Sequence, residues 1–128
     1  MARFLIVDDS REFREVICNW IAAQPGWSVG TAAADGSEAL AEVERWRPDV
    51  VLMDAMMPGL DGFAATSLIK LRPDAPPVVI LSVHDSPSTR QAAEDAGADG
   101  FVGKADLVGM LPGVLRSILD RAKNAPND

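Results

Sequence analysis

The sequence predicts an α/β fold with a central parallel sheet. Five short apolar runs recur along the 128 residues, and each gap between them is long enough for a helix and two loops. The first, third and fourth runs are apolar at nearly every position, which is typical of strands covered by helices on both faces. We expect the five strands at residues 4–7, 27–31, 50–53, 78–81 and 101–102.

The composition indicates a globular protein and excludes several classes of function. With 48% hydrophobic and 24% charged residues, a chain of this length suits one globular domain. The formal net charge of −7 gives no basic surface for a phosphate backbone, so we expect no direct binding to nucleic acid. The single cysteine, Cys18, excludes an internal disulfide and a cysteine cluster for zinc. Because the N-terminal apolar run is too short to span a membrane, we expect a cytoplasmic protein without a membrane partner.

The first two helices are predicted from apolar spacing and capping residues. One apolar stripe at helical spacing marks the first helix: Phe13, Val16, Ile17, Trp20 and Ile21. Asp35 and Glu38 have the spacing of a capping box, which predicts the start of the second helix, and Pro48 stops it. The residues of the second helix expected to face inward are Leu40, Val43 and Trp46.

The third helix is predicted to begin near Asp61 and to end before Pro73, because proline cannot continue a helix. The position of Asp61 before this helix favours an N-cap over a metal ligand. We expect the third helix to bury Leu68 and Leu71.

Proline and glycine set the limits of the last two helices. Ser86 and Pro87 are typical of the N-cap and first position of a fourth helix, and Gly97 follows its end. In the fifth helix an interior proline would remove a backbone hydrogen bond, so we expect regular helix from about Pro112 and a separate turn over 106–110. The expected core residues of the fifth helix are Leu111, Val114, Leu115, Ile118 and Leu119.

Polar side chains follow four of the expected strands at the point where each strand ends. The carboxyl ends of parallel strands meet at one edge of the sheet, where ligands bind. Asp54 directly follows a strongly apolar run, and a buried carboxylate is costly unless it has a partner. We therefore expect a shared polar pocket made by Asp8, Asp9, Asp54, Ser82 and Lys104.

The charges of this pocket indicate its chemistry. Three neighbouring carboxylates repel one another, so a cation should bind among them. An all-oxygen site without histidine or cysteine favours a hard ion, and few carboxylates suit Mg²⁺ better than Ca²⁺. With the Lys104 ammonium, the metal would hold a tetrahedral oxyanion against Asp54, and the Ser82 hydroxyl would donate to it. The pattern predicts phosphoryl transfer to a carboxylate nucleophile.

Four separated motifs make the interpretation specific. The segments FLIVDD, VLMDAMMPGLDG, VVILSVHD and AGADGFVGK resemble, in this order and spacing, the receiver domain of two-component response regulators, the CheY-like family. The residues around LSVHDS and GFVGKAD most resemble receivers of the NarL/FixJ type. The resemblance covers essentially residues 3–122, so we expect a receiver domain over 1–122 and a polar tail or linker start over 123–128. It implies a flavodoxin-like, doubly wound five-stranded sheet in the order 2-1-3-4-5, with five helices on both faces.

The resemblance also implies a role for each site residue. Asp54 is the expected phospho-acceptor, and Lys104 would contact the phosphoryl group. Ser82 and Phe101 occupy the two switch positions of the family. The expected Mg²⁺ ligands are Asp8, Asp9, Asp54 and the backbone carbonyl of Met56.

Partners follow from the same resemblance. The phosphoryl donor would be a sensor histidine kinase or a histidine phosphotransfer protein. The fourth helix, fifth strand and fifth helix would signal to an output domain or a downstream protein, in a free-standing receiver or as part of a longer regulator. We expect a phosphorylated switch that assists its own phosphorylation and dephosphorylation rather than an enzyme. Homodimerisation on activation stays open.

Two residues need separate interpretation. Most receivers have proline after the lysine, whereas this sequence has Ala105. We expect a trans bond there, because a cis bond to a non-proline residue costs about 3 kcal/mol. His84 either tunes the lifetime of an aspartyl phosphate or is a solvated loop residue.

Three other functions fit the sequence less well. A protein-interaction module of the same fold, independent of phosphorylation, would not need the complete acidic set. A hydrolase with an aspartate nucleophile needs a second acid two residues later, where this chain has Met56. A flavin-binding protein needs a phosphate loop after the first strand, where Asp8 and Asp9 would repel the cofactor.

Overall fold

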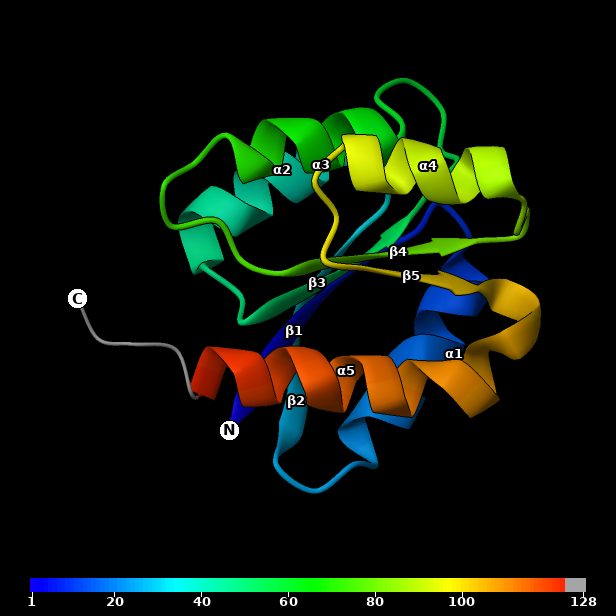
Figure 1. The fold of residues 1–128 in the computed structure, drawn as a ribbon. Coiled ribbons are helices and arrows are strands. Elements are labelled where there is room, and N and C mark those ends of the chain that lie inside the picture. Colours follow the sequence, from blue (N-terminus) through cyan, green and yellow to red (C-terminus); the bar gives the residue numbers. More distant parts are fainter. Residues whose placement is uncertain (124–128) are drawn as a thin grey trace.

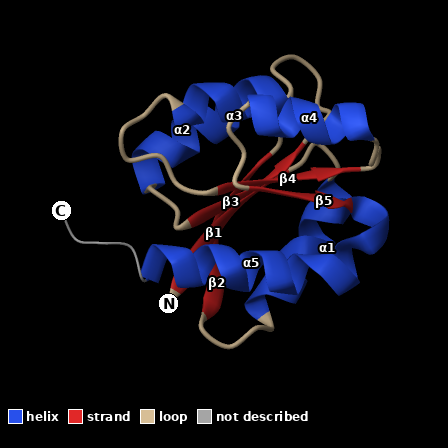
Figure 2. Ribbon diagram, viewed as in Figure 1, coloured by secondary structure: helices blue, strands red, loops and turns tan. Residues whose placement is uncertain are grey.

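The predicted parallel sheet is present in the structure, a computed structural model that describes residues 1–123. Its strands are β1 (Ala2–Val7), β2 (Trp27–Ala33), β3 (Val50–Asp54), β4 (Val78–Ser82) and β5 (Gly100–Gly103). They pair in parallel in the order β2-β1-β3-β4-β5 (Figure 2). The five expected strands and the flavodoxin-like order are therefore confirmed.

Helices cover both faces of this sheet. They are α1 (Arg11–Ala22), α2 (Gly36–Trp46), α3 (Gly62–Lys70), α4 (Pro87–Asp95) and α5 (Leu107–Lys123), and a 3₁₀ turn, η1 (Lys104–Asp106), precedes α5. Figure 1 shows α2, α3 and α4 on one face of the sheet and α1 and α5 on the other. Parallel neighbours require crossover connections, and these helices provide them.

The two faces of the sheet form two hydrophobic cores. Strands β3 and β4 are buried at every position, as expected for strands covered on both sides. Leu5 and Val7 of β1 pack in the core that includes α2 and α3, whereas Phe4 and Ile6 pack in the core that includes α1 and α5. This alternation follows from the two-residue period of a strand. The sheet is thus a rigid base for the loops at its carboxyl end.

Side-chain caps fix where helices begin, as the sequence predicted. At α2, the Asp35 carboxylate accepts a hydrogen bond from the Glu38 N–H at 2.8 Å. The Glu38 carboxylate accepts from the N–H of Ala34 at 2.7 Å, one residue earlier than in a standard capping box. Ser86 caps α4, and Pro87 is the first residue of that helix. These caps satisfy N–H groups that have no partner inside the helix.

The predicted burial was wrong at Leu68 and Leu71, and one residue of the apolar stripe on α1 is exposed. On α1, Ile17 and Ile21 are buried, but Val16 is 65% exposed. The part of α1 that is buried against the sheet is therefore narrower than the stripe formed by its five apolar residues. On α3, Leu68 and Leu71 are 45% and 78% exposed, so neither is a core residue.

Small residues explain the error on α3. Its buried residues are Gly62, Ala65, Thr66 and Ile69, which fall at i, i+3, i+4 and i+7. Small side chains on this stripe let the helix backbone lie close to the sheet. The opposite face, which carries the two leucines, is therefore turned to solvent.

The path of α5 also differs from the prediction. Regular helix begins at Leu107 and continues through Pro112 instead of starting there. The N–H that Pro112 lacks would have bonded to the carbonyl of Val108. Val108 is 81% exposed, so this turn of the helix faces solvent. The core residues of α5 include three of the predicted ones, Leu111, Leu115 and Ile118.

The C-terminal helix reaches Lys123. Of the polar tail expected over 123–128, residues 124–128 lie outside the described part of the chain. Within residues 1–123, none of the helices combines the length and the apolar character needed to cross a bilayer.

Gly62 brings α3 against the end of β3. Its N–H donates a hydrogen bond to the carbonyl of Ala55 at 2.9 Å. A Cβ atom at Gly62 would collide with the backbone carbonyl oxygen of Asp54. Glycine is required for this approach, so Gly62 fixes the distance between α3 and the strand end that carries Asp54.

We expect Gly62→Ala to lower the free energy of unfolding by about 1–3 kcal/mol, because the added methyl group must displace backbone atoms. Urea denaturation followed by tryptophan fluorescence measures the change. Gly109→Ala is the matched control, since a Cβ at Gly109 inside α5 would meet no heavy atom of residues 1–123 within 4 Å apart from its chain neighbours and the adjacent backbone of its own helix. The control should gain up to about 1 kcal/mol. Equal stability of the two variants would contradict the close approach of α3.

Candidate functional site

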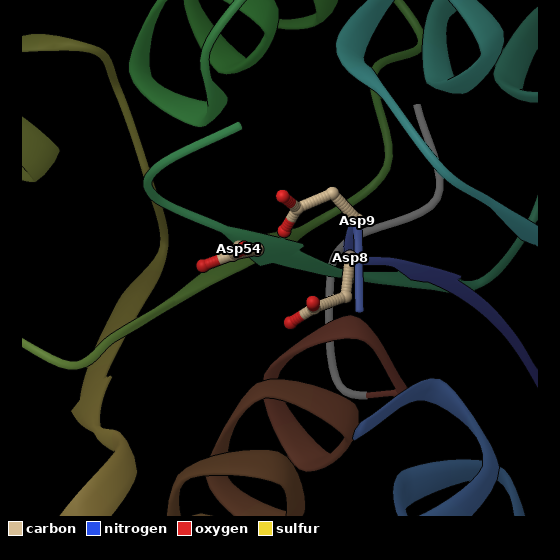
Figure 3. Close-up of side chains that lie close together, drawn as sticks. All are labelled: Asp8, Asp9 and Asp54. Carbon is tan, nitrogen blue, oxygen red and sulfur yellow. The ribbon is translucent and has the colours of Figure 1, made fainter. Parts of the chain in front are cut away.

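The carboxyl ends of four strands bring the predicted site residues to one edge of the sheet. Asp8 and Asp9 follow β1, Asp54 ends β3, Ser82 ends β4, and Lys104 follows β5. Carboxylate oxygens of the three aspartates lie within 4.8 Å of one another. Figure 3 shows the Asp8 and Asp9 carboxylates on either side of Asp54. Asp8 and Asp54 are buried, with 3% and 5% exposure, whereas Asp9 is exposed.

Lys104 joins the two buried carboxylates. Its Nζ lies 2.8 Å from Asp8 Oδ2 and 3.2 Å from Asp54 Oδ1. The lysine side chain is only 18% exposed. Attraction between charges is stronger in such a partly dry pocket than in water, which offsets part of the cost of burying them. The ammonium partly neutralises the two carboxylates but leaves the cluster of three with a net negative charge.

The electrostatics of the pocket show in the pKa of Asp54. Burial is the main cause that raises this pKa from 3.8 to about 6, and the Asp8 charge adds to the effect. The Lys104 charge and a hydrogen bond from the Met56 N–H lower it only in part. The ionised form of Asp54 is therefore short of positive charge in this pocket.

The donor set fits a hard divalent cation. Each of the three aspartates offers a carboxylate oxygen, and the exposure of Asp9 leaves one side of the cluster open to water. Mg²⁺ takes oxygen ligands and keeps several waters, so a small set of carboxylates that is open to water on one side suits it. A cation there would also supply the positive charge that Asp54 lacks. The carbonyl of Met56 stays a predicted ligand.

The loop between β1 and α1 is held by contacts that the sequence reasoning did not identify. The Ser10 N–H donates to Asp8 Oδ1 at 2.8 Å, and the Ser10 hydroxyl accepts from the Phe13 N–H at 3.2 Å. Arg14 Nη1 donates to the carbonyl of Asp8 at 2.7 Å. The Phe13 ring lies 4.0 Å from Lys104 Nζ. Ser10, as an N-cap residue directly after the two aspartates, was the available sequence signal.

Ser82 is fixed to the loop that follows β4. Ser82 is 1% exposed, and its hydroxyl oxygen accepts a hydrogen bond from the His84 N–H at 3.1 Å. The His84 side chain is exposed at the rim of the site. Ser82 thus lies at the acidic edge, with its hydroxyl engaged by the backbone of the loop between β4 and α4.

Phe101 lies farther from the carboxylates, on β5, and is half-buried. The Arg90 guanidinium carbon is 4.8 Å from the centre of its ring. Arg90 also forms two hydrogen bonds to Asp85, at 2.6 and 2.9 Å, which lower the pKa of that carboxyl group. These contacts connect the loop before α4, α4 itself and β5. An open groove beside them is lined by residues that include Arg90, Phe101, Asp106, Val108 and Met110.

The substitution of Ala105 for the proline common in receivers does not move Lys104 out of the site. No peptide bond among residues 1–123 is cis, so the expected trans bond after Lys104 is present. Lys104 begins the 3₁₀ turn η1, and its side chain reaches back over the ends of the strands.

Comparison with known proteins agrees with this geometry. The model of the response regulator receiver domain family matches residues 4–110. The chain is 40% identical over 126 residues to the response regulator MprA of Mycobacterium leprae, covering 98% of this chain and 54% of the relative. MprA of Mycobacterium avium is 38% identical over 121 residues, with coverages of 94% and 52%. The chain thus spans about half the length of the curated relatives it matches.

Solved structures give the same result. The response regulator domain of Thermotoga maritima CheB superposes with a TM-score of 0.83 at 30% identity, covering 98% of this chain and 99% of that one. The signal receiver domain of NarL from Mycobacterium tuberculosis also gives 0.83 at 30% identity, with coverages of 96% and 97%. The family model, the relatives and the sheet order together show that this chain belongs to the response regulator receiver domain family.

Proposed function

We propose that Asp54 accepts a phosphoryl group, with Mg²⁺ bound by Asp8, Asp9, Asp54 and the carbonyl of Met56. One observation carries the proposal: the Lys104 ammonium lies 2.8 and 3.2 Å from two buried carboxylates of a three-aspartate cluster. Such a pocket offers a nucleophile together with positive charge for the oxygens of a transferring phosphoryl group. Accepting phosphate is the chemistry that these groups support best.

Position and burial favour Asp54 over its neighbours as the acceptor. Asp8 accepts from the Ser10 N–H with Oδ1 and from Lys104 with Oδ2, so its carboxylate anchors the loop before α1 and the lysine. Asp9 is exposed and would be less shielded from water. Asp54 is buried at the end of the central strand β3 and directly contacts Lys104.

Transfer of the phosphoryl group from a phosphohistidine to Asp54 is a displacement at phosphorus. A carboxylate oxygen of Asp54 attacks phosphorus, the P–N bond breaks, and the imidazole nitrogen leaves with the bonding electrons and takes up a proton from water. The Lys104 ammonium and the Ser82 hydroxyl donate hydrogen bonds to the phosphoryl oxygens of the new acyl phosphate. Mg²⁺ held by Asp8, Asp9 and Asp54 would supply further neutralisation of the developing negative charge.

The proposed switch couples the site to α4, β5 and α5. In the present conformation the Ser82 hydroxyl is bound to the loop before α4. Donation from Ser82 to a phosphoryl group would pull on that loop, which Asp85 and Arg90 connect to Phe101. Phosphorylation would thereby shift an equilibrium between two forms of this surface. Ser82 and Phe101 are the proposed switch residues.

The proposed setting is that of a two-component system. A sensor histidine kinase or histidine phosphotransfer protein donates the phosphoryl group in the cytoplasm, and an output domain or a downstream protein reads the surface. Homodimerisation of the phosphorylated form belongs to the same proposal. The exposed residue His84, whose N–H donates to Ser82, would tune the lifetime of the acyl phosphate through the access of water, or would remain a solvated loop residue without that role. The chain acts as a switch rather than as a turnover enzyme.

The acceptor is tested by incubating the protein with Mg²⁺ and acetyl phosphate and measuring the intact mass. We expect the wild type to gain one phosphoryl group and Asp54→Asn to gain none, because the amide is a poor nucleophile. Asp61→Asn is the matched control and should be phosphorylated, since its carboxylate caps α3 by accepting from the Ala64 N–H and asparagine caps equally well. A wild type that gains no mass would favour the phosphorylation-independent module.

The metal site is tested by thermal unfolding with and without Mg²⁺. If Mg²⁺ binds only the folded state, a Mg²⁺ concentration ten times the dissociation constant adds about 1.4 kcal/mol to the free energy of unfolding. This gain raises the midpoint of thermal unfolding by roughly 5 °C. Asp9→Asn should lose most of this shift at the same Mg²⁺ concentration, because it removes one carboxylate from the cluster. Asp120→Asn, a change of the same charge at an exposed position of α5, should keep it. The same shift in both variants would exclude Asp9 as a ligand.

A further inference from the structure

We propose that Phe13 is a positioning residue for Lys104: its ring holds the ammonium at the edge where Asp8 and Asp54 meet. The Phe13 ring centre lies 4.0 Å from Lys104 Nζ, well inside the range of about 6 Å at which aromatic rings attract cations. The effect on phosphoryl transfer rests on the proposed function. The placement of the ammonium itself does not.

The ring complements the two carboxylates. Lys104 Nζ has contacts of 2.8 Å with Asp8 and 3.2 Å with Asp54. An aromatic face attracts positive charge through its quadrupole but offers no lone pair, so the ammonium hydrogens stay available to the oxygens. The low exposure of the lysine side chain, 18%, strengthens this attraction, since little water competes.

Phe13 is itself held in place by the acidic site. Asp8 Oδ1 accepts from the Ser10 N–H, and the Ser10 hydroxyl accepts from the Phe13 N–H. The Phe13 ring contacts Lys104, whose Nζ donates to Asp8 Oδ2. These four contacts lead from Asp8 through Ser10, Phe13 and Lys104 back to Asp8. The start of α1 is thus fixed relative to the same carboxylate that the ammonium binds.

Lys104 needs such support because of its place in the chain. It starts the turn η1 at the end of the edge strand β5, and its four-carbon side chain is flexible. Asp9 and Asp8 both offer negative charge near Asp54, so electrostatics alone do not select one position for the ammonium. Contact with the ring favours the position between Asp8 and Asp54.

Phe13 also packs against the core that includes α1 and α5, and this structural role must be separated from positioning. Phe13→Leu keeps an apolar side chain but removes the ring. Phe13→Tyr keeps the ring, and its hydroxyl can reach water because Phe13 is only half-buried. Trp20→Leu is a matched control on the same helix. The centre of the Trp20 ring lies 6.1 Å from the centre of the Trp27 ring, so this side chain packs against Trp27 and not at the site.

The position of the ammonium is measured by NMR of protein labelled with ¹³C at the lysine ε carbon. The sequence has three lysines, Lys70, Lys104 and Lys123, so the spectrum is simple to assign. We expect the Lys104 ε protons to be shifted upfield by the ring, while Lys70, bound to Asp99, is not. Phe13→Leu should abolish this shift, and Phe13→Tyr and Trp20→Leu should retain it. A Lys104 signal that is unchanged in Phe13→Leu would overturn the proposal.

The consequence for chemistry is measured as the rate of phosphorylation by acetyl phosphate in Mg²⁺. We expect Phe13→Leu to slow the reaction roughly threefold to thirtyfold, as loss of one cation–π contact implies. Phe13→Tyr should restore the rate, and Trp20→Leu should leave it unchanged. In a Lys104→Ala background Phe13→Leu should cause no further loss, whereas an equal loss in both backgrounds would show a purely structural role and overturn the positioning role.

The two proposals fail in different ways. If the wild type gains no phosphoryl group, the proposed function is wrong, but the Lys104 ring shift still decides whether Phe13 places the ammonium. If the wild type is phosphorylated and the shift survives Phe13→Leu, only the positioning role is wrong.

Discussion

Two buried carboxylates, those of Asp8 and Asp54, share one ammonium, and the rest of the site is arranged around this contact. Lys104 lies 2.8 and 3.2 Å from them, while Asp9 adds a third negative charge at the exposed side. Burial is the main cause that raises the pKa of Asp54 to about 6, the charge of Asp8 adds to it, and Lys104 offsets the rise only in part. The fold keeps these charges together only because the core on both sides of the sheet holds the strand ends fixed.

The strand order determines which side chains can meet. β1 and β3 are neighbours at the centre of the sheet, so Asp8 and Asp54 lie side by side without a long reach. β5 is separated from β3 by β4, and a residue after β5 needs a long side chain to contact Asp54. Lysine meets this requirement, and Ser82, at the end of β4, lies on the path between them. The strand order therefore explains where each residue lies and why the one after β5 has a long side chain.

The sequence predicted the strands, most caps and the polar edge, because these depend on local pattern. Apolar runs identify buried strands, and parallel strands place their ends together whatever packs on the faces. Burial on helices was less predictable. Leu68 and Leu71 are exposed because the small residues of α3, with Gly62 first among them, decide how closely that helix approaches β3. Such an approach is a tertiary property that no local pattern contains.

Phe13 illustrates the same limit at the site. Its spacing on α1 predicts only an apolar contact, which it makes. Its distance of 4.0 Å from Lys104 depends on two segments 91 positions apart, as 104 minus 13 gives, and on the loop that Ser10 fixes. Residues that act through another side chain leave no motif of their own.

The shared ammonium also suggests how chemistry at β3 would reach the far edge of the sheet. Under the proposed function, phosphoryl oxygens on Asp54 would compete with Asp8 for the hydrogens of Lys104, and the lysine belongs to the turn that links β5 to α5. The Ser82 hydroxyl would also form a hydrogen bond to these phosphoryl oxygens. A change in two hydrogen bonds would then act on both ends of the surface formed by α4, β5 and α5. Because the core beneath is closely packed, such a surface is expected to move between discrete arrangements rather than deform gradually.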